Sequence, residues 1–347
     1  MTSTQGPTGT TTTPTSATTT DRGVRRLISL VVGITAVIAL MLLAFAAPAI
    51  NSGANDLPLA VSGPGPAVTQ VTGALSSNRP GAFDVTTYPT AADAARAIGD
   101  RDAIGGIAVA PTGITIQTAA GAGAPYAPLL RGIGTQLAAS GQNVTYQEVA
   151  PLTIDDPTGA GLTALGLPLI FGGLASAAAL VLAYRGAVAT RALTALALSV
   201  LAGFTVTAIL QFGFGSFDGS YWLTATAVSA GIAAISLTVL GLGLLLGPAG
   251  IGLGAVLMLF VANPLSGMAT GPAWLPQPWG QIGQYLPLGA AGTTIRSAAY
   301  FDGNGDTTAW IVLGCWALAG LLLALLASRR TATTALASTD EPGLRYA

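Results

Sequence analysis

The chain lacks most of the side chains on which enzymes and metal sites depend. Its 347 residues include no histidine and one cysteine, Cys315. Zinc and haem sites of the usual kinds need histidine or several cysteines, and Ser-His-Asp and Cys-His catalysis need histidine. A single cysteine forms no intramolecular disulfide bond. We therefore expect a protein that is not an enzyme, with no catalytic residue, no cofactor site and no metal site.

Charge is also scarce. Only 8% of the residues are charged, against about 25% in an average soluble domain, and 51% are hydrophobic. From Gly219 to Ile295 the chain has no Asp, Glu, Lys or Arg. A charge at the centre of a bilayer costs roughly 2.5–3.5 kcal/mol on insertion scales, so charge is removed where the chain lies in hydrocarbon. This composition predicts an integral membrane protein with the lipid bilayer as its surroundings.

Lysine is absent altogether, and the net charge is −1 with no clustered basic stripe. Nucleic-acid binding needs such a stripe to neutralise phosphates, so no nucleic-acid partner is expected. A nucleotide-binding P-loop needs a lysine in its Gly-x-x-x-x-Gly-Lys motif. Any ATPase that works with this protein must therefore be a separate chain.

Apolar runs of helix length predict an α-helical membrane protein with six transmembrane helices. The first, residues 27–48, is longer than the 7–15 residues of a signal-peptide core, which favours an uncleaved anchor over cleavage near Ala44-Phe45-Ala46. A membrane domain of five helices, residues 161–328, follows after a long polar segment. Its apolar runs cover 161–184, 192–214, 223–246, 249–262 and 309–328, and the fourth is short for a span of about 30 Å.

The arginines predict the orientation. With six spans and the N-terminus inside, eight arginines fall on the cytoplasmic side: Arg22, Arg25, Arg26, Arg185, Arg191, Arg329, Arg330 and Arg345. Five spans would put the Arg329-Arg330 pair outside. We expect a multi-pass protein of the plasma membrane with both termini cytoplasmic. Residues 1–26 should form a disordered tail with a basic flank, and residues 329–347 a second cytoplasmic tail.

Residues 51–157 differ in composition and predict a small extracytoplasmic α/β domain between the first and second spans. Strands are expected at 57–62, 83–88, 104–110, 113–118 and 144–149, and helices at 67–76, 91–98 and 126–139. Thr90 with Asp93 has the spacing of a helix N-cap. Asp84, Asp93, Asp100 and Asp102 have no EF-hand spacing, so a solvated surface explains them better than a cation site.

Glycines cluster around Pro248, between the expected fourth and fifth spans. Gly243 and Gly247, and likewise Gly250 and Gly254, have the small-xxx-small spacing of closely packed helices. A tight hairpin is the favoured interpretation, and a functional hinge is the alternative. No span carries an acidic or basic residue well inside it, which disfavours coupling to an ion through an intramembrane carboxylate.

The segment 263–308, expected as an exterior or re-entrant loop, carries the most specific pattern. Its distinctive residues are Asn263, Pro264, Ser266, Gly267, Gly271, Trp279, Gly280, Pro287, Arg296, Asp302 and Gly303. With this loop and its order of spans, the chain from about residue 25 to 330 resembles actinobacterial membrane proteins of the type-2 ABC exporter permease superfamily, near the phage-infection-protein-like branch.

The resemblance implies a permease-like subunit, homodimeric or heterodimeric, of an ABC-type exporter in the cell membrane. Such a subunit moves a hydrophobic or amphiphilic compound and uses a separate cytoplasmic ATPase. The alternative is a non-transporting envelope protein whose exterior domain binds a protein, a surface polymer or a phage. The compact exterior segment differs from the larger insertion that is common in that branch.

Overall fold

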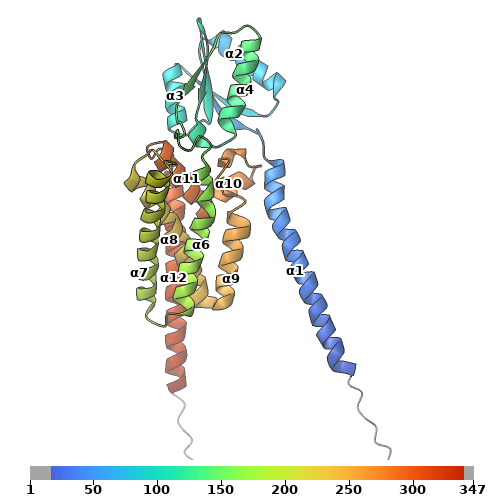
Figure 1. Ribbon diagram of the computed structural model, residues 1–347, viewed down its shortest axis with the longest axis vertical. Helices are drawn as coiled ribbons and strands as arrows, with labels where there is room; N and C mark the ends of the chain where they lie inside the picture. Colours follow the sequence, from blue (N-terminus) through green and yellow to red (C-terminus); the bar gives the residue numbers. More distant parts are fainter. Residues whose placement is uncertain (1–16, 340–347) are drawn as a thin grey trace, which may run out of the picture. The chain divides into compact units, whose positions relative to one another are not determined.

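The computed structural model describes the backbone of residues 17–339 and the side chains of residues 23–329. The described chain is mostly helical and includes one five-stranded sheet (Figure 1). Five of its helices are long and apolar enough to cross a membrane, as expected of a membrane-embedded protein. The chain divides into two compact units, one ending at Ala46 and the other beginning at Ala47.

Helix α1 (Ala17–Asn51) extends through the first unit. Its part from Gly23 to Asn51 has a mean hydropathy of 2.8 in its most apolar window, which is that of a membrane span. The helix begins ten residues before the expected boundary at Leu27, where a disordered tail was predicted. Because extending a nucleated helix costs little, the apolar run carries helical structure into its polar flank. Residues 1–16 of the expected tail lie outside the described residues.

The α/β domain belongs to the second unit and has nine elements. They are β1 (Leu57–Ser62), α2 (Gly65–Asn78), β2 (Phe83–Tyr88), α3 (Ala91–Gly99), β3 (Gly105–Ala110), β4 (Gly113–Thr118), the 3₁₀ turn η1 (Ala120–Ala122), α4 (Tyr126–Ala139) and β5 (Val144–Glu148). The sequence predicted all five strands and all three α-helices within two residues at each end. Thr90 caps α3 as expected, since its Oγ1 accepts the backbone N–H of Asp93 at 3.1 Å.

The strands lie in the order β2-β1-β3-β4-β5. Only β3 and β4 pair antiparallel, as a hairpin, and the other neighbours are parallel. Parallel neighbours need crossover helices. Helices α2 and α4 pack on one face of the sheet over Leu59, Ile107 and Ile116. Helix α3 packs on the opposite face, where Ile98 lies against Ala60.

The helical part follows the α/β domain in the same compact unit. Its elements are α5 (Ala160–Ala164), α6 (Gly166–Leu182), α7 (Val188–Ala208) with the π-turn η2 (Ile209–Gly213), α8 (Tyr221–Leu246), α9 (Pro248–Val256) with the π-turn η3 (Leu257–Ala262), the 3₁₀ turn η4 (Pro272–Trp274), α10 (Trp279–Gln284), α11 (Pro287–Tyr300) and α12 (Thr307–Thr339). All five apolar runs predicted in this part are helical.

Helix α8 lies at the centre of the helical part. In its most apolar window 72% of the residues are buried, against 39% or less in the other spanning-length helices. Small residues let its neighbours approach closely. A Cβ built on Gly173, Gly203, Gly231 or Gly320 would lie within 3 Å of an atom across an α8 interface. The bundle is thus assembled around one helix.

The segment Pro248–Ala262 is shorter than the other apolar helices. Helix α9 contributes 9 residues and η3 another 6. At 1.5 Å per residue they rise about 22 Å, short of the roughly 30 Å of a bilayer core. The structure therefore has five helices of spanning length among its described residues and one shorter apolar helix.

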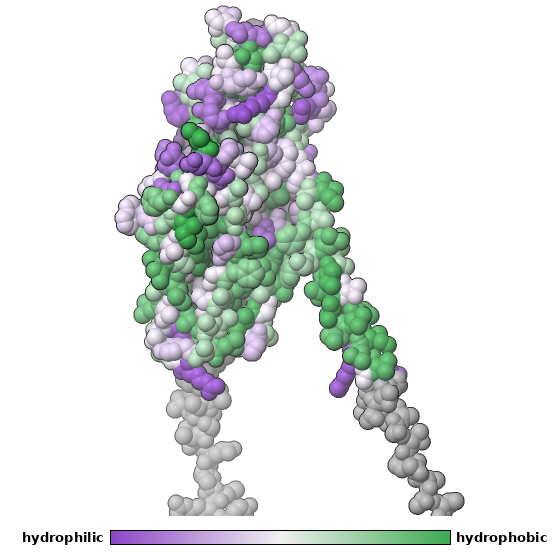
Figure 2. Space-filling model, in the orientation of Figure 1, coloured by the Kyte–Doolittle hydropathy of each residue, from purple (hydrophilic) through white to green (hydrophobic). Residues whose placement is uncertain are grey.

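The surface changes character along the second unit. Figure 2 shows apolar side chains gathered over the helices and polar side chains over the α/β domain. Large exposed apolar residues of the helices include Phe171, Leu193, Leu201 and Leu322. A surface of this kind is stable in hydrocarbon, not in water.

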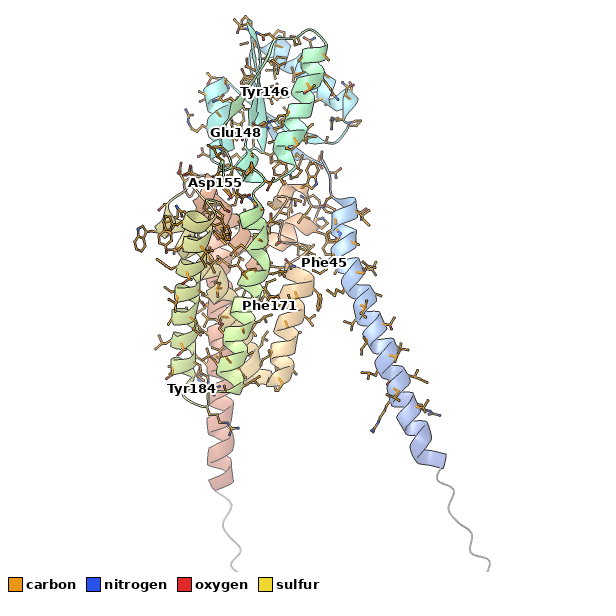
Figure 3. The ribbon with its side chains drawn as sticks, viewed as in Figure 1. Phe45, Tyr146, Glu148, Asp155, Phe171 and Tyr184 are labelled. Carbon is orange, nitrogen blue, oxygen red and sulfur yellow. The ribbon has the colours of Figure 1, made fainter. Side chains whose placement is uncertain are left out.

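Charged residues lie at opposite ends of the helical part. Tyr184 follows α6 at the end far from the α/β domain, and Asp155 precedes α5 beside that domain (Figure 3). Val181 lies against Gly243 near the end of α8, so Arg185 and Arg191 come just beyond that end. The acidic residues Asp155, Asp156, Asp218, Asp302 and Asp306 lie in the connections on the side of the α/β domain. The helices therefore separate a basic end from an acidic end.

Candidate functional site

The loop 263–308 folds into an ordered layer around helix α11. Twelve of the 14 residues of α11 are buried. Gln284 joins two parts of the layer because its amide donates to the Ser266 carbonyl and its Oε1 accepts the Thr293 hydroxyl. The expected helix at residues 288–301 is present, and the preceding Pro/Trp segment packs over it.

Arg296 lies at the centre of this layer with 1% of its surface exposed. Its Nη2 donates to the carbonyl oxygen of Met268 at 2.6 Å and to that of Gly267 at 3.2 Å. No carboxylate pairs with it among the described side chains. Burial lowers the pKa of Arg296, while Tyr126 and Tyr300 act in the opposite direction. Backbone carbonyls thus replace the acidic partner that a buried arginine usually has.

Backbone geometry at two glycines shapes this carbonyl site. Gly267 has φ +63° and Gly271 has φ +80°, in the left-handed region that favours glycine. A Cβ on Gly267 would also lie 2.8 Å from the nitrogen of Pro272. The Ser266 hydroxyl accepts the N–H of Met268 and donates to the Asn263 carbonyl, which fixes the turn. Four of the sequence-selected residues therefore act on the same turn.

The remaining sequence-selected residues of the loop lie apart from Arg296. Pro287 is buried at the first turn of α11, and Gly280 packs against the Pro272 carbonyl. Asp302 and Gly303 both have positive φ in the turn after α11. Trp279 is 51% exposed, and Pro264 lies half-buried after η3. These residues shape or border the loop and do not form one pocket.

The space beside Arg296 is too small for an organic ligand. It measures about 10 Å³, is bordered by Ala269, Tyr300 and η1, and is about the size of one water molecule. The nearby Tyr126 hydroxyl is buried without a hydrogen-bond partner, and burial raises its pKa to about 12. The surroundings of Arg296 therefore have the properties of a structural core.

This core joins the α/β domain to the helical part. Ala124 donates its N–H to the Ala269 carbonyl, and the rings of Tyr126 and Trp274 meet edge to face at 6.0 Å. After α3, Arg101 donates to the Thr293 carbonyl at 3.1 Å and lies 5.5 Å from the centre of the Phe301 ring. The two parts consequently share one packed interface and one compact unit.

The glycines around Pro248 lie in the hairpin between α8 and α9. A Cβ on Gly250 would lie 2.0 Å from the Leu242 carbonyl oxygen, and one on Gly254 would lie 2.8 Å from Val239. Gly243 contacts Val181 and α9. Gly247 is the turn residue with φ +65°. This arrangement is that of a tight hairpin, with three of the glycines at helix contacts.

The largest cavity described here lies in the α/β domain, and the topology explains it. Helices α2 and α4 are the crossovers between strands at opposite sides of the sheet, β1-β2 and β4-β5. The crossover between β2 and β3, helix α3, packs on the other face, and β3 joins β4 by a hairpin without a helix. No helix therefore covers β3 between α2 and α4. A groove remains over the middle of the sheet.

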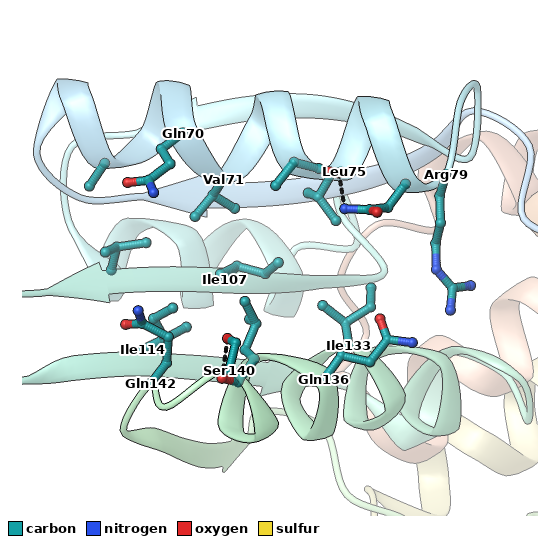
Figure 4. A pocket seen from close by; sticks show the side chains of 15 residues that line it. Gln70, Val71, Leu75, Arg79, Ile107, Ile114, Ile133, Gln136, Ser140 and Gln142 are labelled. Atoms are coloured by element: carbon teal, nitrogen blue, oxygen red, sulfur yellow. Dashed lines mark hydrogen bonds between the residues drawn. The ribbon is translucent and has the colours of Figure 1, made fainter.

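This groove has an apolar floor and a polar rim (Figure 4). Its volume is about 460 Å³, within the 300–1,000 Å³ usual for ligand pockets. Val71, Leu75, Ile107, Val109, Ile114, Ile133 and Leu137 form the floor and walls, and Gln70, Asn78, Arg79, Gln136, Ser140 and Gln142 form the rim. The lining contains no aromatic and no acidic side chain.

Arg79 is the single charged residue of the groove lining. It is half-buried where the chain leaves α2, and its side chain points into the groove (Figure 4). Neither of the two ion pairs found among the described side chains includes it, and its guanidinium has no hydrogen-bond partner there. By contrast, Arg131 on the neighbouring helix α4 lies 3.3 Å from Glu148. Arg79 can therefore bind an anionic group that enters the groove.

Sequence reasoning selected none of the groove residues. The apolar positions of α2 and α4 indicated two amphipathic helices, but the gap between them follows from which face each crossover helix covers. The antiparallel β3-β4 hairpin was predicted from Pro111-Thr112-Gly113, and it was the available signal for a strand without a covering helix. The side chains described here also include no cluster of three or more potential metal ligands.

Comparison with known proteins adds no family assignment. The chain matches no protein-family model, no curated protein and no solved structure. The function is therefore inferred from the groove, the loop around Arg296 and the helical part.

Proposed function

We propose that the chain is a permease-like membrane subunit of an exporter that moves a hydrophobic or amphiphilic compound with energy from a separate ATPase. The groove over β3 and β4 carries this proposal. It offers apolar surface for such a compound, in a domain packed directly against the membrane helices. A bound compound would thus be held next to the membrane part. The loop motif supports assignment to the type-2 ABC exporter permease superfamily.

The proposed topology has six spans, with α9 and η3 as the short one, and the α/β domain outside the plasma membrane. The basic end of the helical part at Arg185 and Arg191 supports a cytoplasmic location for that end. The acidic residues near the α/β domain agree with an exterior location. With six spans, both termini are cytoplasmic.

A dimer is part of the proposal because one copy packs its helices around α8. Ala227, Ala234 and Val239 on α8 are fully buried, so small apolar side chains fill the centre of the bundle. A translocation path is better placed between two copies than through such a centre. The path would involve no catalytic residue of this chain, since the ATPase performs the chemistry.

Purification from the native membrane tests the exporter. We expect a stoichiometric ATPase to accompany the full-length protein in mild detergent. The turn between α6 and α7 is the cytoplasmic docking surface in this topology, so Arg185→Glu should remove the ATPase. Arg131→Glu in the α/β domain is the control and should leave it bound. Repeated purification of the intact protein without an ATPase would refute the exporter.

A non-transporting envelope protein is the second candidate, and the packed centre of the bundle favours it. In that case the helices would only anchor the α/β domain, which binds a protein, a surface polymer or a phage. Deleting residues 55–155 separates the two functions. Loss of partner capture in the absence of any ATPase favours the anchor, whereas ATPase binding that survives the deletion favours the exporter.

A further inference from the structure

The shape and composition of the groove limit what it can bind. A polysaccharide site usually offers aromatic rings and many polar groups, and the groove lining contains no aromatic residue. A peptide strand needs a free sheet edge, but β3 and β4 are paired on both sides. An apolar chain needs only the floor of Val71, Ile107 and Ile114. The lining therefore fits a hydrocarbon chain better than a sugar or an added strand.

The charge of the groove defines the other end of its ligand. Arg79 is the one charged lining residue, and no acidic side chain neutralises it. An arginine donates a planar fork of N–H groups that matches a carboxylate or a phosphate. The neutral rim residues Gln136 and Gln142 add amide donors without adding charge. The rim therefore favours an anionic group at the end of an apolar chain.

We infer that the groove binds a single-chain amphiphile with an anionic headgroup, its hydrocarbon chain on the sheet and its headgroup at Arg79. This inference names the substrate class of the proposed exporter and rests on that function. From Ala67 to Arg79 the groove follows α2 for twelve residues, about 18 Å at helical rise. That length accommodates one extended acyl chain, and the volume of about 460 Å³ leaves no room for a bulky polymer.

Photolabelling of the full-length protein tests the site. The protein is placed in phosphatidylcholine nanodiscs and labelled with a palmitate that carries a diazirine on its chain. We expect labelled peptides from residues 67–79 and 133–142, identified by mass spectrometry. Labelling that is confined to the membrane helices would overturn the inference.

Two substitutions test the two ends of the proposed ligand. Arg79→Gln removes the charge and should reduce groove labelling about tenfold, the effect of losing about 1.4 kcal/mol. Ala74→Trp fills the groove from an exposed position and should abolish labelling. Arg131→Gln and Ala138→Trp are matched controls outside the lining and should label like the wild type. Equal labelling of all five proteins would contradict the site.

Competition identifies the headgroup. Palmitate and lysophosphatidylglycerol carry a carboxylate and a phosphate, and competition by both indicates a general anion site. Competition by one of them assigns the headgroup class. If neutral dodecyl maltoside competes equally well, or if a bound protein protects the groove in place of lipid, the inference is wrong. The assay needs no ATPase, so failure of the exporter and failure of this site remain distinguishable.

Discussion

Two arginines of the same compact unit have opposite surroundings. Arg296 is 1% exposed and donates two hydrogen bonds to backbone carbonyls in the loop over α11. Arg79 is half-buried at the end of the groove, and its guanidinium has no partner among the described residues. The comparison teaches that the more buried arginine already has its ligands and serves the fold. The exposed one is available to a ligand.

Removing the Arg296 side chain should cause the largest loss of stability. Arg296→Ala leaves two buried carbonyls unpaired and opens a cavity, which together cost about 3 kcal/mol or more. Thermal unfolding in nanodiscs, followed by tryptophan fluorescence, measures the loss. An unchanged melting temperature for Arg296→Ala would show that the carbonyl site does not hold the loop.

The α8-α9 hairpin offers a matched pair of glycines on one helix. Gly250→Ala would place a Cβ 2.0 Å from the Leu242 carbonyl oxygen, whereas a Cβ on Gly252 meets nothing within 4 Å. We expect Gly250→Ala to destabilise the protein by about 2 kcal/mol and Gly252→Ala to change its stability little. Equal melting temperatures for the two variants would contradict the close contact.

Gly267→Ala tests whether backbone geometry prepares the site for Arg296. Its φ of +63° and the crowding against Pro272 should cost about 1–3 kcal/mol. Gly132→Ala on α4 is the control, since a Cβ there meets no atom and alanine favours a helix. Stabilisation by both substitutions would mean that the turn at Gly267 is not constrained.

Arg101 lies between the two extremes and sharpens the comparison. It donates to the Thr293 carbonyl and stacks on Phe301, and burial followed by the nearby Arg296 lowers its pKa to about 10. Arg101→Gln should cost about 1–2 kcal/mol because one hydrogen bond and one cation–π contact are lost. Hydrogen exchange should then rise in α3 and α11 together. A rise in only one of them would show that Arg101 does not join the two parts.

Arg79→Gln should have the smallest effect on stability, within about 0.5 kcal/mol, because the folded protein offers the guanidinium no partner to lose. Its melting temperature without ligand should match that of Arg131→Gln, whose side chain lies exposed beside Glu148. A large destabilisation by Arg79→Gln alone would make this arginine structural, like Arg296, and would remove the contrast.

The elements could be predicted from local sequence, whereas the sites depend on tertiary structure. Alternating apolar residues indicated the strands, and Thr90 with Asp93 indicated the start of α3. The surroundings of Arg296 depend on carbonyls 28 and 29 residues away, oriented by a positive φ at Gly267. The groove depends on which sheet face each crossover helix covers. Neither relation is visible in the spacing of residues along the chain.

Native mass spectrometry of the full-length protein, released from its own membrane, tests the groove most directly. The account predicts one retained anionic amphiphile per chain, with a mass that identifies its headgroup. That adduct should be lost in Ala74→Trp and retained in Ala138→Trp. The same adduct, bound equally by both variants, would contradict the assignment of the groove as a ligand site.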